Sequence, residues 1–198
     1  MRLVIVDGLD GVGKDTHAEM IKRRYEQLGE RVVLRSHPES DNVYGRKSKK
    51  ALLGGGKGAK VKATVFYALD VLRSLRLYYR HEDVDTLIMV RYLMGTAYLP
   101  KRLYRLGYRF CSKLVPSSEY MLFLDAPPKE LLSRISRRGE VEIFETEEAL
   151  VRVRKKAMDL VQWGGWSVID TSKSIAKTHA QIESVLNKLD KDFSGPAT

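Results

Sequence analysis

The segment from Gly8 to Thr16 reads GLDGVGKDT and directly follows the apolar run Leu3 to Val6. Gly8, four further residues and then Gly13 and Lys14 form the spacing of a P-loop, whose glycines let successive backbone N–H groups point at phosphate oxygens. Lys14 would reach the outer phosphates, and the helical pattern that follows would add the positive end of its dipole. A chance glycine-rich turn needs neither this strand nor this helix, so the segment predicts a nucleotide-binding loop.

One position departs from the P-loop pattern. The residue after Lys14 is normally a serine or threonine whose hydroxyl binds Mg²⁺, whereas this chain has Asp15 followed by Thr16. The Asp15 carboxylate could bind Mg²⁺ directly or through water, but its charge would also repel phosphates. The residues that we expect to surround the nucleotide are Gly8, Asp10, Gly11, Val12, Gly13, Lys14, Asp15 and Thr16.

The composition suits one globular domain. With 198 residues, 43% of them hydrophobic, the chain can bury a full core, and we expect one domain over residues 1–192 and a frayed tail over 193–198. No stretch reaches the roughly eighteen apolar residues of a membrane span, and no basic-then-apolar leader precedes the first strand. We therefore expect a cytoplasmic protein with no membrane partner. The net charge of +10 favours phosphorylated or polyanionic partners without choosing among them.

Short apolar runs alternate with helical patterns along the chain, which predicts an α/β fold with helices on both faces of a parallel sheet. Five runs read as strands, at 3–6, 31–34, 86–90, 120–124 and 167–169. Helical patterns cover 16–28, 61–79, 129–138, 146–162 and 175–189, and the glycine-rich stretch 54–58 reads as a linker. In such sheets ligands bind where the strands end, so polar side chains at these exits are the candidates for function.

Basic and aromatic residues interleave over 101–113, KRLYRLGYRFCSK. This mixture could pair with and stack on nucleic acid. Leu103, Leu106 and Phe110 recur at helical spacing, however, which favours a basic helix packed into the core. We therefore expect no stable nucleic-acid partner.

Several stretches carry a resemblance to one known family. GLDGVGKDT is similar to the motif G-x-D-G-x-G-K-[ST]-T, and Arg91-Tyr92 to the end of an Asp-Arg-Tyr motif. The stretches 120–127, 131–139 and 168–175 resemble that family's strand before the lid, its lid-entry helix and its closing strand. Together they make most of the chain resemble the thymidylate kinase family of nucleoside monophosphate kinases, as a divergent member.

This resemblance implies a P-loop kinase-type, three-layer fold with a central parallel sheet of about five strands. It also implies transfer of the γ-phosphoryl group of Mg-ATP to deoxythymidine monophosphate, a lid near 134–146, and a homodimer through helix 61–79. The implied catalytic residues are Lys14, Asp10, Arg91, Arg134 and Arg138. The implied substrate-binding residues are Arg35, His37, Phe66, Asp70, Arg73, Arg91 and Tyr92. For the metal we expect water-mediated contacts from Asp10 or Asp15, supported by the hydroxyl of Thr16.

Four departures from the family pattern bear on this expectation. Val90 stands where the motif has an aspartate, and His37 stands in place of a glutamate. Val71 follows Asp70 where an arginine is usual, and the lid is acidic, with Glu140, Glu142 and Glu145. Thymine specificity is therefore less firmly indicated than phosphoryl transfer.

The chemistry leaves three functions open. A phosphate acceptor is already an anion and needs no general base, whereas a sugar hydroxyl needs one. His37 at the second strand exit therefore favours a monophosphate acceptor, while Glu39 nearby keeps a nucleoside acceptor open. The third possible function is that of a P-loop protein that binds nucleotide but catalyses phosphoryl transfer slowly or not at all. Asp15, Val90 and the acidic lid favour it.

Overall fold

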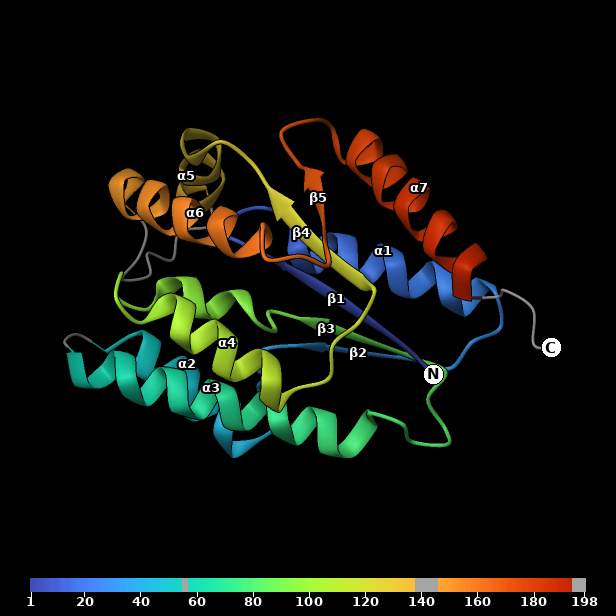
Figure 1. Cartoon of the computed structure of the whole chain (residues 1–198), viewed down its shortest axis with the longest axis horizontal. Helices are drawn as coiled ribbons and strands as arrows, with labels where there is room; N and C mark the ends of the chain where they lie inside the picture. The colour runs from blue at the N-terminus through green and yellow to red at the C-terminus, as the bar shows by residue number, and fades with distance from the viewer. Residues whose placement is uncertain (55–56, 138–145, 194–198) are drawn as a thin grey trace.

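A computed structural model describes residues 1–54, 57–137 and 146–193, which form a three-layer α/β fold around one sheet (Figure 1). The sheet has five strands in the order β2-β3-β1-β4-β5, and every pairing is parallel. The strands are β1 (Arg2–Gly8), β2 (Val32–Ser36), β3 (Thr86–Val90), β4 (Tyr120–Asp125) and β5 (Trp166–Asp170). All five were predicted from the apolar runs, and the expected fold class is confirmed.

Strand β1 lies at the centre of the sheet. It pairs with β3 on one side, where Val6 is opposite Val90, and with β4 on the other, where Val6 is opposite Leu122. These three strands are buried along almost their whole length, whereas the edge strands β2 and β5 are largely half-buried. Because parallel strands end at the same edge, the loop after β1 lies between the exits of β3 and β4.

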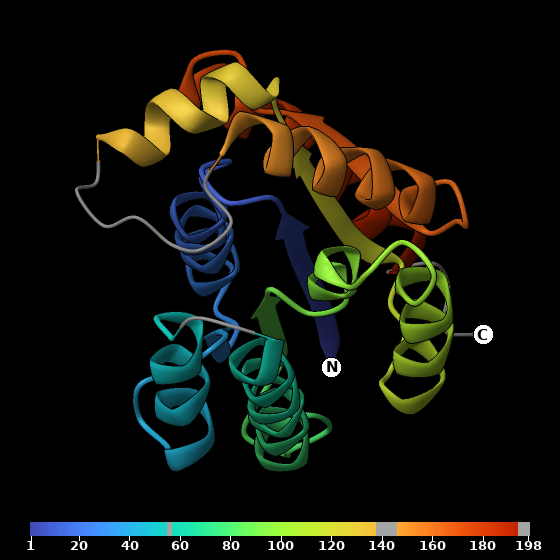
Figure 2. The same cartoon turned by 90° about the vertical axis from the view of Figure 1, so that its left-hand side faces the viewer.

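Helices cover both faces of the sheet, as Figure 2 shows from the side. The helices are α1 (Lys14–Gln27), α2 (Val43–Leu52), α3 (Lys57–Tyr78), α4 (Tyr104–Leu114), α5 (Pro128–Ser136), α6 (Glu147–Val161), α7 (Ile175–Phe193) and the 3₁₀ helix η1 (Met94–Tyr98). Side chains on a strand point alternately to opposite faces. Tyr120 of β4 reaches Asp190 of α7, whereas Phe123 packs edge-on against Trp166, which is bonded to α4. Helices α1 and α7 therefore share one face, and α4 lies on the other.

Helix α4 confirms a helix within 101–113, but its orientation differs from our expectation. Tyr104 and Tyr108 are the residues that it buries, and their hydroxyls bond Asp159 and the indole of Trp166. These two partners lie beneath the tyrosine face and turn it inward, since buried phenols need a polar partner. The residues that we expected in the core are exposed instead, namely Leu103, Leu106 and Phe110.

Two further elements and two boundaries differ from the sequence-based expectations. Helix α2 and the 3₁₀ helix η1 were not predicted. Lys57 and Gly58 belong to α3, so the expected linker 54–58 is shorter than predicted, and residues 55–56 lie outside the described residues. Phe193 is the last residue of α7 and packs against Tyr120, so it is not part of a frayed tail. Within the described ranges, no helix has the length and apolarity needed to cross a membrane.

Arg2 forms a buried ionic cluster at the far end of the sheet from the P-loop. Its guanidinium donates two hydrogen bonds to Glu30, at 2.6 and 2.7 Å, and lies 3.2 Å from Asp190 of α7. The same group lies over the ring of Tyr25, 4.3 Å from the ring centroid. Arg2 therefore ties β1 to helices α1 and α7. Its loss would leave the Glu30 carboxylate without this ion pair, whereas Asp190 would keep Arg24, at 2.8 Å.

We expect Arg2→Met to lower the free energy of unfolding by about 2 kcal/mol, because removing one member of a buried ion pair leaves the charge of the other without compensation. Chemical denaturation measures this change. Arg31→Met is the matched control, since Arg31 pairs with Asp83 and Asp85 while its side chain is 53% exposed. Equal losses of stability in the two variants would contradict the prediction.

Candidate functional site

The loop after β1 has the backbone of a phosphate-binding loop. Gly8, Gly11 and Gly13 all have positive φ, at 149°, 84° and 84°. A Cβ atom on Gly8 would lie 2.3 Å from the carbonyl oxygen of Leu124 in β4, so the loop is pressed directly onto its neighbouring strand. Helix α1 begins at Lys14 without a side-chain cap, which leaves the N–H groups of its first turn facing the loop. The predicted strand, loop and helix are therefore present in the order that the motif requires.

Lys14 folds back over this loop. Its Nζ donates hydrogen bonds to the carbonyl oxygens of Gly8 and Leu9, at 3.0 and 2.6 Å, and lies 3.6 Å from Asp10. The side chain is only 3% exposed, and burial lowers its pKa to about 8, although Asp10 opposes this effect. A buried ammonium held only by two carbonyls and one partly exposed carboxylate is suited to exchange these partners for phosphate oxygens.

Asp10 lies on the open side of the loop. Its carboxylate accepts a hydrogen bond from the hydroxyl of Tyr98, at 2.9 Å, in addition to facing Lys14. Burial opposes ionisation of this carboxyl, but Lys14 and Arg91 outweigh burial and lower its pKa. Tyr98 on η1 was not predicted, because nothing in the sequence brings that helix under the loop.

Asp7, the residue before Gly8, organises the neighbouring strand exit. Its carboxylate is buried and accepts three backbone hydrogen bonds, from Tyr92, Leu93 and Met94, at 2.9, 2.8 and 2.9 Å. Burial raises the pKa of Asp7, and the three N–H groups offset part of this rise. Asp7 directly follows the apolar run predicted as the first strand, but sequence reasoning gave it no role. Its position at the end of a buried strand was the available signal.

Arg91 is held at the exit of β3 by its backbone. It has φ of 58°, which is rare for a residue other than glycine and is kept only where the surroundings impose it. Its N–H donates to the carbonyl of Val6, at 3.1 Å, and its carbonyl accepts the hydroxyl of Tyr67. The guanidinium then reaches Ser36 Oγ, at 3.0 Å, and both carboxylate oxygens of Asp15, at 3.3 Å each. Arg91 thus joins the P-loop helix to the exit of β2.

Two of the residues expected to bind the substrate, His37 and Asp70, belong to buried hydrogen-bond networks. His37 is fully buried, with Nε2 2.9 Å from Ser74 Oγ and Nδ1 3.3 Å from the carbonyl of Val90. Asp70 accepts hydrogen bonds from the backbone of Glu39, at 2.7 Å, and the side chain of Asn42, at 2.6 Å. These contacts fix the loop between β2 and α2 against α3, so the network positions the part of the cleft next to the exit of β2.

Burial lowers the pKa of His37 to about 4, although Asp70 opposes this effect. The unfolded chain, with a pKa near 6.5, binds more protons than the native protein between these values. We therefore expect His37 to reduce the free energy of unfolding by about 2 to 3 kcal/mol as pH falls from 6.5 toward 4. Denaturation at several pH values measures this slope, and His37→Gln should lack that part of it. Identical slopes in the two proteins would sink the prediction.

The remaining predicted substrate residues are placed in different ways. Arg35 pairs with Asp41, at 2.8 Å, and lies 3.5 Å from Glu39, so it braces the same loop. Tyr92 lines the cleft described below, and its hydroxyl donates to the carbonyl of Pro116. Phe66 and Arg73 are not among the residues that line this cleft, whereas Tyr67, the neighbour of Phe66, is.

A cleft of about 2330 Å³ opens over these groups. The P-loop and the exits of β2 and β3 form its floor, with Asp10, Lys14, Asp15, Ser36 and Arg91. Helices α2 and α3 form one wall and α6 another, and η1 adds Tyr98. Figure 2 shows α6 (orange) above α2 and α3 (blue-green), the helices that contribute residues to the cleft lining. Its volume far exceeds that of a site for one small ligand, so two nucleotides can be accommodated.

Arg134, one of the two predicted catalytic arginines of the lid, is not among the residues that line this cleft. Arg134 on α5 donates to the carbonyl of Thr171, at 2.6 Å, and lies 3.4 Å from that of Gly11, behind the P-loop. Arg138, with most of the expected lid, lies outside the described residues. The cleft wall carries four cations of α6 that sequence reasoning missed, Arg152, Arg154, Lys155 and Lys156. The spacing of one helical turn between Arg152 and Lys156 was the available signal.

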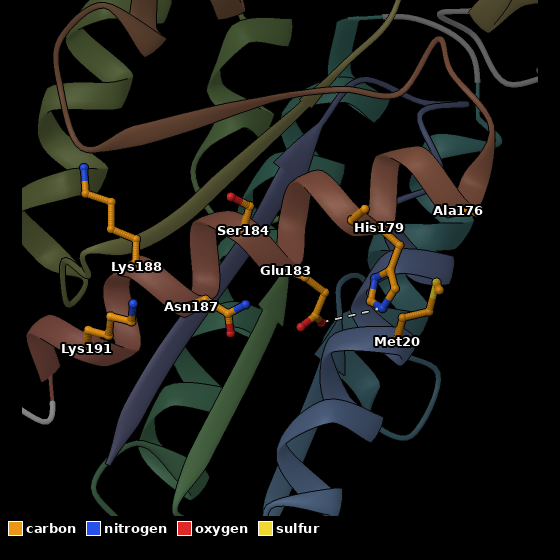
Figure 3. A pocket seen from close by; sticks show the side chains of 9 residues that line it. Met20, Ala176, His179, Glu183, Ser184, Asn187, Lys188 and Lys191 are labelled. Atoms are coloured by element: carbon orange, nitrogen blue, oxygen red, sulfur yellow. Dashed lines mark ion pairs between the residues drawn. The ribbon is translucent and has the colours of Figure 1, made fainter.

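A second hollow, of about 840 Å³, lies between α1 and α7 (Figure 3). Met20 of α1 faces α7 there, and His179 lies 3.6 Å from Glu183. No residue of the P-loop lines it, and it has no part in the site described above.

The phosphate-binding loop follows the middle strand of a parallel sheet with the order 2-3-1-4-5, and helices line the cleft above it on two sides. This arrangement places the chain in the class of P-loop nucleotide kinases. The family model of thymidylate kinase matches residues 6–182, and the chain belongs to the thymidylate kinase family. This family consists of nucleoside monophosphate kinases, which are transferases.

Individual relatives agree with this assignment. A probable thymidylate kinase of Thermococcus kodakarensis is 25% identical, with 94% of this chain and 97% of the relative aligned. A thymidylate kinase of Xanthomonas oryzae pv. oryzae is 28% identical, over 93% of this chain and 82% of the relative. The solved structure of thymidylate kinase from Candida albicans superposes with a TM-score of 0.76 at 15% identity, covering 96% and 92% of the two chains, and supports the fold.

Proposed function

We propose that the protein transfers the γ-phosphoryl group of ATP to the phosphate of thymidine monophosphate. The observation that carries the proposal is the position of Arg91, whose guanidinium lies between the P-loop helix and the exit of β2. A cation at that place lies between the donor and acceptor phosphates, and phosphoryl transfer depends chiefly on such alignment and charge neutralisation.

The acceptor side supports a phosphate rather than a hydroxyl acceptor. A hydroxyl acceptor needs a general base within hydrogen-bond reach. Both ring nitrogens of His37 already face Ser74 and Val90, and Glu39 Oε1 accepts the backbone N–H of Ser36, at 2.7 Å. A monophosphate needs no base, because its oxygen is already an anion.

The loop also suits Mg²⁺ held mainly by nucleotide phosphates. The described residues contain no group of three acidic, histidine or cysteine side chains placed to hold a metal alone. Asp10, Asp15 and the exposed Thr16 are the oxygen donors beside Lys14, and Mg²⁺ typically takes one or two carboxylates together with phosphates and water. We propose that these three residues hold the ion, which supplies charge neutralisation on the phosphates. Lys14 and Arg91 position the two phosphate chains.

The exposed face of α3 supports a homodimer. Leu69 and Leu77 are 38% and 41% exposed and lie about two turns apart, outside the lining of the cleft, while Val71 and Leu75 face the core. We propose that this part of α3 packs against a second copy, and light scattering of wild type and Leu69→Glu tests it. Loss of a dimer in Leu69→Glu but not in Leu106→Glu, on the exposed face of α4, supports the proposal. A monomeric wild type overturns it.

The activity is tested by measuring ADP release from Mg-ATP with a panel of nucleoside monophosphates and nucleosides. We expect thymidine monophosphate to give the highest kcat/KM. Turnover with nucleosides alone would replace the proposal by a nucleoside kinase. ATP binding without turnover on any acceptor would favour a nucleotide-binding module, the function that Asp15 in place of a hydroxyl also suits.

A further inference from the structure

Asp15 has an arrangement that its expected role as a metal contact does not explain. Its carboxylate accepts the hydroxyl of Ser36 and lies 3.3 Å from both terminal nitrogens of Arg91. Ser36 Oγ in turn lies 3.0 Å from Arg91. The three side chains come from the first turn of α1, the end of β2 and the exit of β3, and all three line the cleft.

The backbone around Arg91 is fixed, so only its side chain is free to change partners. The Arg91 N–H and carbonyl are bonded to Val6 and Tyr67, and Asp7 binds the three residues that follow. The guanidinium is 29% exposed and the Asp15 carboxylate is 56% exposed, both on the cleft side. A ligand entering the cleft therefore reaches this ion pair directly.

The ion pair occupies the groups that an acceptor phosphate needs. A carboxylate and a phosphate present similar pairs of oxygens to a guanidinium, which binds either one through two parallel hydrogen bonds. Each oxygen of Asp15 faces one terminal nitrogen of Arg91. An incoming phosphate must displace Asp15, and after displacement the Asp15 charge stays close enough to repel it.

Resting on the proposed function, we propose that Asp15, held by Ser36, is an internal competitor for Arg91 that weakens binding of the acceptor phosphate to the free enzyme. Asp15 is in this sense a positioning residue, since it acts on the acceptor through Arg91. The aspartate at a position where the family motif has a hydroxyl thereby sets acceptor affinity. No covalent bond is made or broken in this exchange of hydrogen-bond partners.

The test is isothermal titration of the acceptor into the nucleotide-free enzyme. The acceptor is the monophosphate that gives the most ADP release in the panel above, and the proteins are wild type, Asp15→Asn and Asp15→Ser. We expect both variants to bind the acceptor about five- to tenfold more tightly, the size expected for removing a partly exposed charged pair and its repulsion. The matching nucleoside, which lacks the phosphate, should bind all three proteins equally. Asp83→Asn, at an exposed ion pair with Arg31, should bind like wild type.

The outcomes separate this inference from the proposed function. A monophosphate other than thymidine monophosphate as best acceptor overturns the proposed specificity but leaves the competition testable. Unchanged or weaker acceptor binding by both Asp15 variants, with thermal unfolding like that of wild type, overturns the inference. A gain in nucleoside affinity equal to the gain in monophosphate affinity does so too, because the effect would then lie outside the phosphate. If no monophosphate binds any of the proteins, both proposals are lost.

Discussion

Lys14→Ala is expected to lower kcat by about 10³-fold, the effect of removing one preorganised charge from a developing phosphate anion. Lys14 is the only lysine whose Nζ bonds P-loop carbonyls among the residues described, and these two bonds show that its side chain already spans the loop. The substitution removes a buried ammonium whose pKa burial has lowered to about 8, so the fold should lose little stability. Steady-state ADP release and a denaturation curve measure the two effects.

Lys22→Ala provides the matched control on the same helix. Lys22 lies two turns further along α1, is 32% exposed and pairs with Glu26 rather than with the loop. We expect its kcat to stay within about twofold of wild type, as is usual for an exposed helix pair. A comparable loss of turnover in the two variants would mean that α1 as a whole, and not the Lys14 charge, supports the reaction.

Gly8→Ala should lower the free energy of unfolding by about 4 kcal/mol, near the upper end of effects from single substitutions. Two costs add at this position. A Cβ would lie 2.3 Å from the carbonyl oxygen of Leu124 and 3.0 Å from a methyl of Val12, and φ of 149° is strained for alanine. Because this carbonyl oxygen belongs to the backbone of the buried strand β4, it cannot move aside without disturbing that strand. Chemical denaturation measures the loss, and nucleotide binding should fall with it.

Gly58→Ala is the control for this prediction. Gly58 lies in α3, has ordinary φ, and a Cβ there would meet nothing within 4 Å. Alanine should stabilise this helix by about 0.5 to 1 kcal/mol, because it restricts the unfolded chain more than glycine does. Gly8→Ala with a stability like that of wild type would show that β4 and the loop separate more readily than the close approach implies.

The parts of the site that follow from local rules were predicted from the sequence. The P-loop is a continuous motif between a strand and a helix, and the order of apolar runs determines which strand exits share an edge. These rules, with the family resemblance for Arg91, predict Lys14, Asp15 and Arg91 at one site, and all three line the cleft of the structure. The motifs that resemble the thymidylate kinase family are spread over most of the chain, and the family model matches residues 6–182.

The parts that depend on side-chain direction were not predicted. Helical spacing marked apolar residues of α4 as core, but polar partners beneath Tyr104 and Tyr108 turned the helix the other way. The sequence did not indicate that the polar atoms of Asp70 and His37 bond the protein's own loop and helix. His37 also lines the cleft, and contact of these two residues with substrate stays a prediction. A sequence identifies which residues carry polar groups, but the distant segment that meets each group is set by tertiary packing.

The position of β1 between β3 and β4 also determines when the site can form as the chain is made. Ile5 lies beside Met89 and Met121, so β1 is synthesised before its partners, which follow more than eighty residues later in the chain. Contacts of such long sequence separation form slowly and leave apolar strands exposed in the meantime. A nascent chain that ends before β4 has no surface for Gly8 to close against. The phosphate loop is therefore synthesised before the strand that it needs, and ATP can stabilise only a chain in which β4 has already been made.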